Sequence, residues 1–162
     1  MALLRLVLML LVVGGLGLLA AGQLGFLRGS VPGDLGVRGG RLKAPSNTEN
    51  SVSSQAGLYP EHPMARYAAI APIAAPAGGP ETLRRLRAVV EGLEGAQVVE
   101  SRDDYLYVQF TTRWLKFVDD VEFWFDPAAG VVQVRSASRV GRKDFGVNRA
   151  RVEVIRRVLE KG

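Results

Sequence analysis

The apolar positions of this chain form an unbroken run near the N-terminus and a periodic pattern in the second half of the sequence. From Leu6 to Leu27 the only strongly polar side chain is Gln23. A helix of that length is about 33 Å long, close to the hydrocarbon thickness of a bilayer. The run therefore predicts a transmembrane helix, and we assign residues 1–28 to an N-terminal anchor or signal segment.

Two interpretations of this segment stay open. Arg5 followed by apolar residues has the layout of a secretory signal, in which the small residues Ala20, Ala21 and Gly22 would mark the cleavage site. The apolar run continues past these residues to Leu27, which favours a retained anchor. A strict count of flanking positive charges would leave the domain in the cytoplasm. The signal-like layout and the lack of cysteine favour the opposite side, so we expect a membrane-anchored domain in the periplasm or at the cell surface, secreted if the segment is cleaved.

The rest of the chain divides by composition. Residues 29–54 are rich in Gly, Ser, Asn and Pro and have no sustained hydrophobic period, which predicts a flexible linker. Residues 55–162 are assigned to a single domain, because a segment of this length can bury one modest core.

Periodic segments within that domain predict two helices and several antiparallel strands. Apolar residues recur at helical spacing in residues 80–93 and again in 145–161, where Asp144 is a natural N-cap. Further segments are predicted as strands: 67–73, 96–101 and 105–112. The prediction is an α+β fold, a two-layer sandwich of a mainly antiparallel sheet with two helices, preceded by one N-terminal transmembrane helix.

The hairpin of residues 119–137 can be placed in register from the sequence. Alternation sets Phe123 opposite Val134 on the core face, and it sets Glu122 opposite Arg135 on the other face. A slip of one residue would exchange the two faces, so their agreement supports this pairing.

Composition excludes several functions. The chain has 162 residues, one histidine and no cysteine, which rules out disulfides, thiol nucleophiles and multi-histidine metal sites. The net charge of +5 is not gathered in one run, and no aromatic residues alternate with the C-terminal arginines. Nucleic acid is therefore an unlikely partner. We expect no cofactor and no metal.

One patch holds candidate chemistry. The segment from Arg135 to Arg149 joins a strand to a helix N-terminus and is rich in hydrogen-bond donors. Such an end attracts anions, so we predict a binding site for an anionic small molecule or envelope component. Its candidate ligand-binding residues are Ser53, Ser54, Arg135, Ser138, Arg139, Asn148 and Arg149. In the alternative interpretation the arginines pair with nearby acidic residues, and Asp144 itself satisfies the helix amides.

Catalysis is the second hypothesis. Ser53 or Ser54 as a nucleophile would need a base, and His62 is the only histidine of the chain. This pattern would suit a hydrolase acting on an envelope component, but we assign no catalytic residue. A purely structural role is the third hypothesis.

Three stretches together resemble a known family. They are Asn50–Ala56 (NSVSSQA), Asp119–Phe123 (DDVEF) and Arg135–Arg149 (RSASRVGRKDFGVNR). Their order and spacing are similar to the domain of unknown function 1499 family, over about residues 44–160. The resemblance implies a bacterial envelope-associated or lipoprotein-like protein and no particular reaction. Members usually carry a cysteine where this chain has Ser51, so thiol chemistry proposed for relatives does not apply here.

Overall fold

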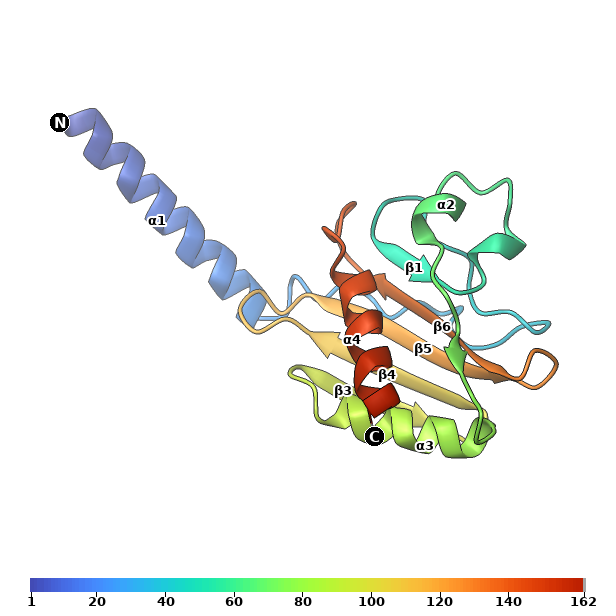
Figure 1. Ribbon diagram of the computed structural model, residues 1–162. Helices are drawn as coiled ribbons and strands as arrows, with labels where there is room; N and C mark the ends of the chain where they lie inside the picture. Colours follow the sequence, from blue (N-terminus) through green and yellow to red (C-terminus); the bar gives the residue numbers. More distant parts are fainter. Residues whose placement is uncertain (162) are drawn as a thin grey trace.

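The computed structural model describes residues 1–161 and shows a long helix projecting from an α+β domain (Figure 1). Helix α1 (Ala2–Gln23) has apolar side chains on all sides, and Gly22 is its only buried residue. With a mean hydropathy of 2.5 over its most apolar stretch, α1 is long and apolar enough to cross a membrane. The predicted membrane-length helix is therefore confirmed.

The domain is built on a six-stranded antiparallel sheet. Its main path has the order β1-β6-β5-β4-β3, and β2 pairs with the other end of β6. The strands are β1 (Ser51–Ser53), β2 (Ile73–Ala74), β3 (Ala96–Ser101), β4 (Tyr105–Thr111), β5 (Val118–Asp126) and β6 (Val131–Ser138).

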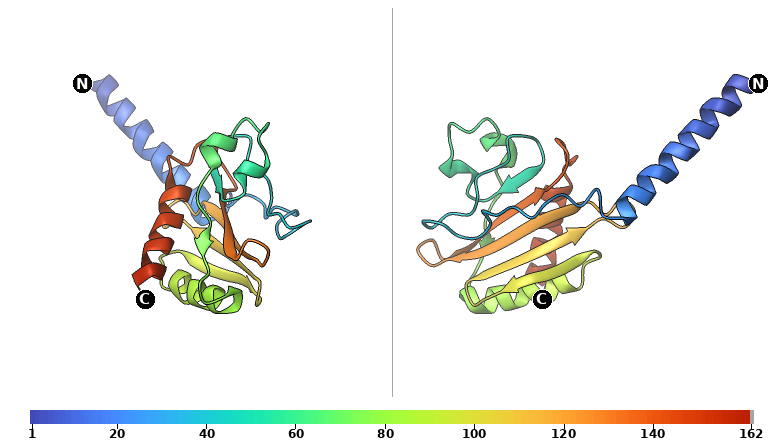
Figure 2. Two further views of the ribbon diagram at one scale, coloured as in Figure 1. Left: turned by 45° about the vertical axis from the view of Figure 1, so that its right-hand side comes forward. Right: turned by 180° about the vertical axis from the view of Figure 1, so that it is seen from behind.

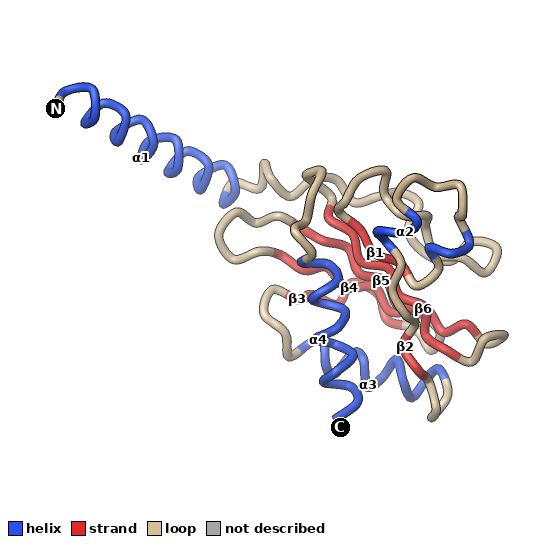
Figure 3. Tube along the Cα trace, turned by 45° about the horizontal axis from the view of Figure 1, so that its top comes forward, coloured by secondary structure: helices blue, strands red, loops and turns tan. Residues whose placement is uncertain are grey.

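Two helices form the second layer, which confirms the predicted sandwich. Helices α3 (Gly79–Glu91) and α4 (Val147–Lys161) cover the same face of the sheet (Figures 2 and 3). Their apolar stripes, including Leu86 and Ile155, pack with Phe123 and its neighbours in one buried cluster. Two short elements, η1 (Ala56–Leu58) and α2 (Ala65–Ala68), follow β1.

The register of the β5–β6 hairpin agrees with the prediction. Phe123 lies opposite Val134, and Glu122 lies opposite Arg135. The first pair is part of the core beneath the helices. The second pair is also buried, with 0% and 3% of the two residues exposed, because the face that carries it is covered as well.

The predicted strand over residues 67–73 is wrong for most of its length. Residues 65–68 form the helical turn α2, and only Ile73–Ala74 pairs with β6. The free edge of β6 is shared, because β1 pairs with its C-terminal half and β2 with its N-terminal end. The chain crosses between these two places, and Pro72 has no amide hydrogen to donate to a ladder.

Residues 29–54, predicted as a flexible linker, lie against the sheet face opposite the helices (Figure 2, right). Leu42 is 1% exposed and packs with Tyr105, Tyr107 and Trp124. The end of the segment contributes β1 to the sheet. We call residues 29–46 the covering segment, and the domain thus begins well before residue 55.

Candidate functional site

The structure divides the predicted patch between the two faces of the sheet. Side chains alternate along β6, so neighbouring residues point to opposite faces. The Ser136 hydroxyl donates a hydrogen bond to Asn148 of α4, on the helix side. Arg135 faces Glu122 under the covering segment, and Arg139 pairs with Asp120.

On the helix side, Asn148 is fully buried and its hydrogen bonds are satisfied. Its carbonyl oxygen accepts from the Ser136 hydroxyl. Its amide nitrogen donates to the Asn50 carbonyl at 3.1 Å, the Ser138 hydroxyl at 3.0 Å and the Asp144 carboxylate at 2.8 Å. Asn148 therefore joins α4 to β6 and to the chain before β1, which is a structural task.

Asp144 occupies the N-terminus of α4. Its carboxylate accepts from the amides of Gly146 and Asn148, both at 3.0 Å, and from the Tyr67 hydroxyl at 2.9 Å. Burial alone would raise the pKa of Asp144, but these hydrogen bonds outweigh it and lower the pKa. The helix amides that were predicted to attract an anion are already bonded to this carboxylate.

Arg149 also holds the chain together. Its guanidinium donates to the carbonyls of Tyr67 and Ala69, in the segment that crosses from α2 to β2. Arg149 thus holds that crossing segment in place. Within residues 1–161 it shares no hydrogen-bond partner with Arg135 or Arg139.

The two candidate serines bond to their own surroundings. The Ser53 hydroxyl accepts from the Gln55 amide, and the Ser54 hydroxyl donates to Gln133 at 2.7 Å. His62 accepts from the amide of Met64 through Nδ1. Within the part of the chain that the structure describes, neither serine is hydrogen-bonded to His62, so the geometry assembles no serine–histidine pair.

On the covered face, Arg139 and Asp120 form a tight pair. Nε and Nη2 of Arg139 donate to the two carboxylate oxygens at 2.8 and 2.7 Å. The Tyr107 hydroxyl donates to the same carboxylate at 2.5 Å. The hydrogen bond to Asp120 raises the pKa of Arg139 despite the opposing effect of burial, so this guanidinium stays charged.

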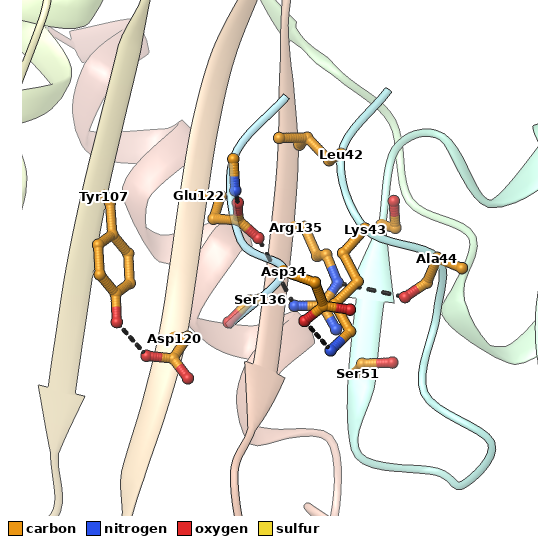
Figure 4. Close-up of polar contacts among 12 residues, drawn as sticks. Asp34, Leu42, Lys43, Ala44, Ser51, Tyr107, Asp120, Glu122, Arg135 and Ser136 are labelled. Atoms are coloured by element: carbon orange, nitrogen blue, oxygen red, sulfur yellow. Dashed lines mark hydrogen bonds and ion pairs between the residues drawn. The ribbon is translucent and has the colours of Figure 1, made fainter. Parts of the chain in front are cut away.

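The neighbouring pair, Glu122 and Arg135, is poorly matched (Figure 4). Oε1 of Glu122 accepts from the Gly36 amide at 2.7 Å and from the Tyr105 hydroxyl at 2.8 Å. Oε2 has no hydrogen-bond partner among residues 1–161 and lies 3.7 Å from Nη1 of Arg135. Burial raises the pKa of Glu122 and lowers that of Arg135.

Arg135 and Arg139 border a pocket of about 220 Å³ between the covering segment and the sheet. Three basic residues and one acidic residue line it, together with several hydroxyls and one amide. The lining residues are Ser30, Pro32, Lys43, Ser46, Asn50, Asp120, Arg135, Ala137, Ser138 and Arg139. The pocket is thus rich in donors and basic in character.

Most N–H donors of the Arg135 guanidinium, which borders this pocket, have no hydrogen-bond partner among residues 1–161. Across the described chain its one hydrogen bond runs from Nε to the Ala44 carbonyl, at a long 3.4 Å. A guanidinium carries five N–H donors, and a buried one is normally paired and hydrogen-bonded. The side-chain oxygen of Asn50, which also lines the pocket, is likewise buried without a partner in residues 1–161.

The pocket unites Arg135, Ser138 and Arg139 of the predicted set. Lys43 and Asn50 were not among the predicted residues, because both lie in the segment whose composition predicts a linker. The first family-like stretch includes Asn50 and was the one sequence feature that pointed to this wall of the pocket.

A larger hollow of about 460 Å³ lies where α3 ends beside α4. Of its two basic residues, Arg151 is already paired with Asp119 at 2.5 Å and stacks over the Phe110 ring, and Arg113 lies over the Trp114 ring. No group of three or more His, Cys, Asp or Glu side chains that could hold a metal occurs within residues 1–161. The pocket beside Arg135 is therefore the better candidate site.

The fold and this pocket define a class of protein: a small α+β domain with a basic cavity beneath an N-terminal segment, attached to a membrane-length helix. The chain belongs to the family described as "Protein of unknown function (DUF1499)", whose family model matches residues 41–159. The match thus includes the end of the covering segment, residues 41–46, which contains the buried Leu42. No curated protein and no solved structure matches the chain.

Proposed function

We propose that this chain is a membrane-tethered binding protein of the cell envelope whose pocket holds a small anion, a phosphate or carboxylate group. The observation that carries this proposal is the buried guanidinium of Arg135, which borders the pocket with most of its donors unused. A planar guanidinium matches the oxygens of carboxylate and phosphate in bidentate geometry.

The surroundings of Arg135 favour an added anion. Taking a charge out of water costs several kcal/mol unless good partners replace the water, and Glu122 at 3.7 Å is a weak partner. Because burial raises the pKa of Glu122, this carboxyl takes up a proton more readily than an ordinary glutamate. Protonation of Glu122 would leave the charge of Arg135 for a ligand. Lys43, at the half-exposed rim, is a second basic group and is paired with Asp34 at 2.6 Å.

The lining supports binding more than catalysis. General acid–base catalysis needs a group that exchanges protons near neutral pH, most often histidine, and His62 is not among the lining residues. The carboxylate oxygens of the acidic residue Asp120 are already bonded to Arg139 and Tyr107.

Titration calorimetry of the full-length chain in detergent tests this proposal, with inorganic phosphate and succinate as probes. A charged hydrogen-bonding partner contributes about 1.5–3 kcal/mol, so Arg135→Gln should weaken binding by at least about tenfold. Lys43→Gln, at the rim, serves as a second variant that leaves the buried pair intact. Arg84→Gln is the matched control, because Arg84 lies exposed on α3 and outside the pocket. The proposal fails if neither probe binds, or if Arg135→Gln and Lys43→Gln bind as the wild type does.

We also propose that the domain lies on the extracytoplasmic side, in the periplasm or at the cell surface. The signal-like layout of the N-terminal segment and the absence of cysteine support this side. Since the chain has no cysteine, Ala129→Cys in the exposed β5–β6 turn provides a single reporter. A membrane-impermeant maleimide should label it in intact cells, and labelling only after lysis would refute this location.

A further inference from the structure

The C-terminal end of α1 is built onto the loop between β4 and β5, residues 112–117. Gly22 is buried there, and a Cβ atom at this position would lie 2.6 Å from the Leu115 carbonyl oxygen. The side chain of Gln23 donates a hydrogen bond to the Trp114 carbonyl at 2.9 Å. These contacts fix the loop at the point where the apolar helix ends.

If α1 crosses a bilayer, that position would place Trp114 at its edge. The 22 residues of α1 span about 33 Å, so the helix end coincides with the boundary between hydrocarbon and headgroups. Trp114 is 64% exposed although it is a large aromatic residue, and Arg113 lies over its ring. Tryptophan prefers the membrane–water interface, because its ring is apolar and its N–H is polar.

A second loop, residues 139–147, lies at the same end of the domain as the C-terminal end of α1 (Figures 1 and 2). Its start is next to the chain leaving the helix, since a Cβ atom on Gly29 would touch Arg139 and Val140. Phe145 in this loop is 93% exposed and has a φ of 53°. A left-handed conformation is rare for a bulky residue and often marks a functional position.

The charges around these aromatics are positive. We define the membrane-facing surface as residues 24–32, 112–117 and 139–147. The basic residues that it exposes at least in part are Arg28, Arg113, Lys116, Arg142 and Lys143, the last of which pairs with Glu49 at 3.0 Å. Arg139 also belongs to this surface, but its side chain is buried against Asp120. The only acidic residue of the surface is Asp144, which is buried as the cap of α4. Exposed aromatic side chains among basic ones are the pattern that suits an anionic lipid surface.

We propose that the membrane-facing surface docks on the bilayer in which α1 is anchored, with Trp114 and Phe145 in the headgroup region and the basic side chains on anionic lipid. This inference rests on retention of α1 and is independent of any ligand in the pocket. The domain is then held against the membrane at three places, the helix end and the two loops.

Fluorescence quenching by brominated lipid tests this surface, using the full-length chain in phosphatidylglycerol vesicles. The chain has two tryptophans, and Trp124 is a natural control because it is buried near the far end of β5. Trp124→Phe leaves only Trp114, whose emission should fall by at least half in brominated vesicles. Trp114→Phe leaves only Trp124, whose emission should not change. The difference in quenching between the wild type and Trp114→Phe also reports on Trp114, and this comparison leaves the buried Trp124 in place.

The second loop has its own test. In a chain without its two native tryptophans, Phe145→Trp should be quenched, whereas Leu58→Trp, at an exposed site in η1 away from α1, should not. The proposal would be overturned if brominated lipid left the emission of Trp114 unchanged. So would equal quenching at positions 58 and 145, or a mature chain found by mass spectrometry to begin after the Ala20–Gly22 region. Failure of anion binding in the pocket would leave these readings unchanged.

Discussion

Replacing Arg135 by methionine should destabilise the domain in a pH-dependent way. At 3.7 Å and an effective dielectric constant of about 20, the attraction between Arg135 and Glu122 is about 4.5 kcal/mol. Burial costs each ion several kcal/mol, so the pair contributes little net stability while it is intact. Arg135→Met leaves the carboxylate of Glu122 buried without its counter-ion, which typically costs about 3–5 kcal/mol.

The cost of Arg135→Met should depend on pH, because the Glu122 carboxylate can lose its charge by binding a proton. Burial already raises the pKa of Glu122, and loss of the Arg135 charge raises it further. A carboxyl whose pKa is higher in the folded state binds protons more tightly there, so its penalty is absent below the ordinary value of 4.5 and grows as pH rises towards the folded pKa. Each unit of pKa difference corresponds to about 1.4 kcal/mol.

Urea unfolding of the full-length chain in detergent, followed by tryptophan fluorescence at pH 5 and pH 8, measures this effect. We expect Arg135→Met to cost more at pH 8 than at pH 5. The double variant Glu122→Gln with Arg135→Met should recover most of the stability and lose this part of the pH dependence. A cost of Arg135→Met below about 1 kcal/mol at pH 8, the range of an exposed ion pair, would refute the penalty of a buried unpaired carboxylate. An equal cost at both pH values would refute it as well.

Three further predictions use the same unfolding assay. Leu42→Ala should cost about 2–5 kcal/mol, because it empties a buried site under the covering segment, whereas Leu58→Ala at an exposed site should cost less than about 0.5 kcal/mol; equal effects would mean that the segment adds nothing to the fold. Asn148→Ala should cost about 2–3 kcal/mol, because it leaves several buried polar groups without their partner; a cost below about 0.5 kcal/mol would contradict its structural role. Asp144→Ala should cost about 1–2 kcal/mol at pH 7 and less at pH 3. The pKa of Asp144 is lowered, so its contribution is complete above the ordinary value of 3.8 and is lost as pH falls through the folded pKa; an unchanged cost at pH 3 would rule out this cap.

The sheet and its helices could be predicted because their residues repeat with a regular period. Leu106 and Val108 alternate with Tyr105 and Tyr107, and the structure places the two sets in separate clusters on opposite faces. The pairing of Glu122 with Arg135 followed from the same alternation. Register is a local property of two strands, so the sequence of a hairpin is enough to define it.

The covering segment could not be predicted, because it is held by contacts that have no period. Only Leu35, Val37 and Leu42 add apolar side chains to its cluster. A further contact is made by the backbone, in which the amide of Gly36 donates to Glu122. Backbone donors are present in every sequence, so composition cannot distinguish this segment from a flexible one. The sequence therefore predicted the arginines of the pocket but not the covering segment, which forms the opposite wall.

The two faces of β6 explain why the proposed binding site lies on one side and not on the other. On the helix side, Asn148 is hydrogen-bonded to Ser136 and Asp144, and the Asp144 carboxylate accepts from the Asn148 amide at the start of α4. On the covered side, Arg135 keeps unused donors beside a cavity. The wall of that cavity includes Ser30 and Pro32, only a few residues beyond the end of α1. The segment that leaves α1 therefore also closes the pocket, so an anion bound there would lie at the end of the domain that carries α1.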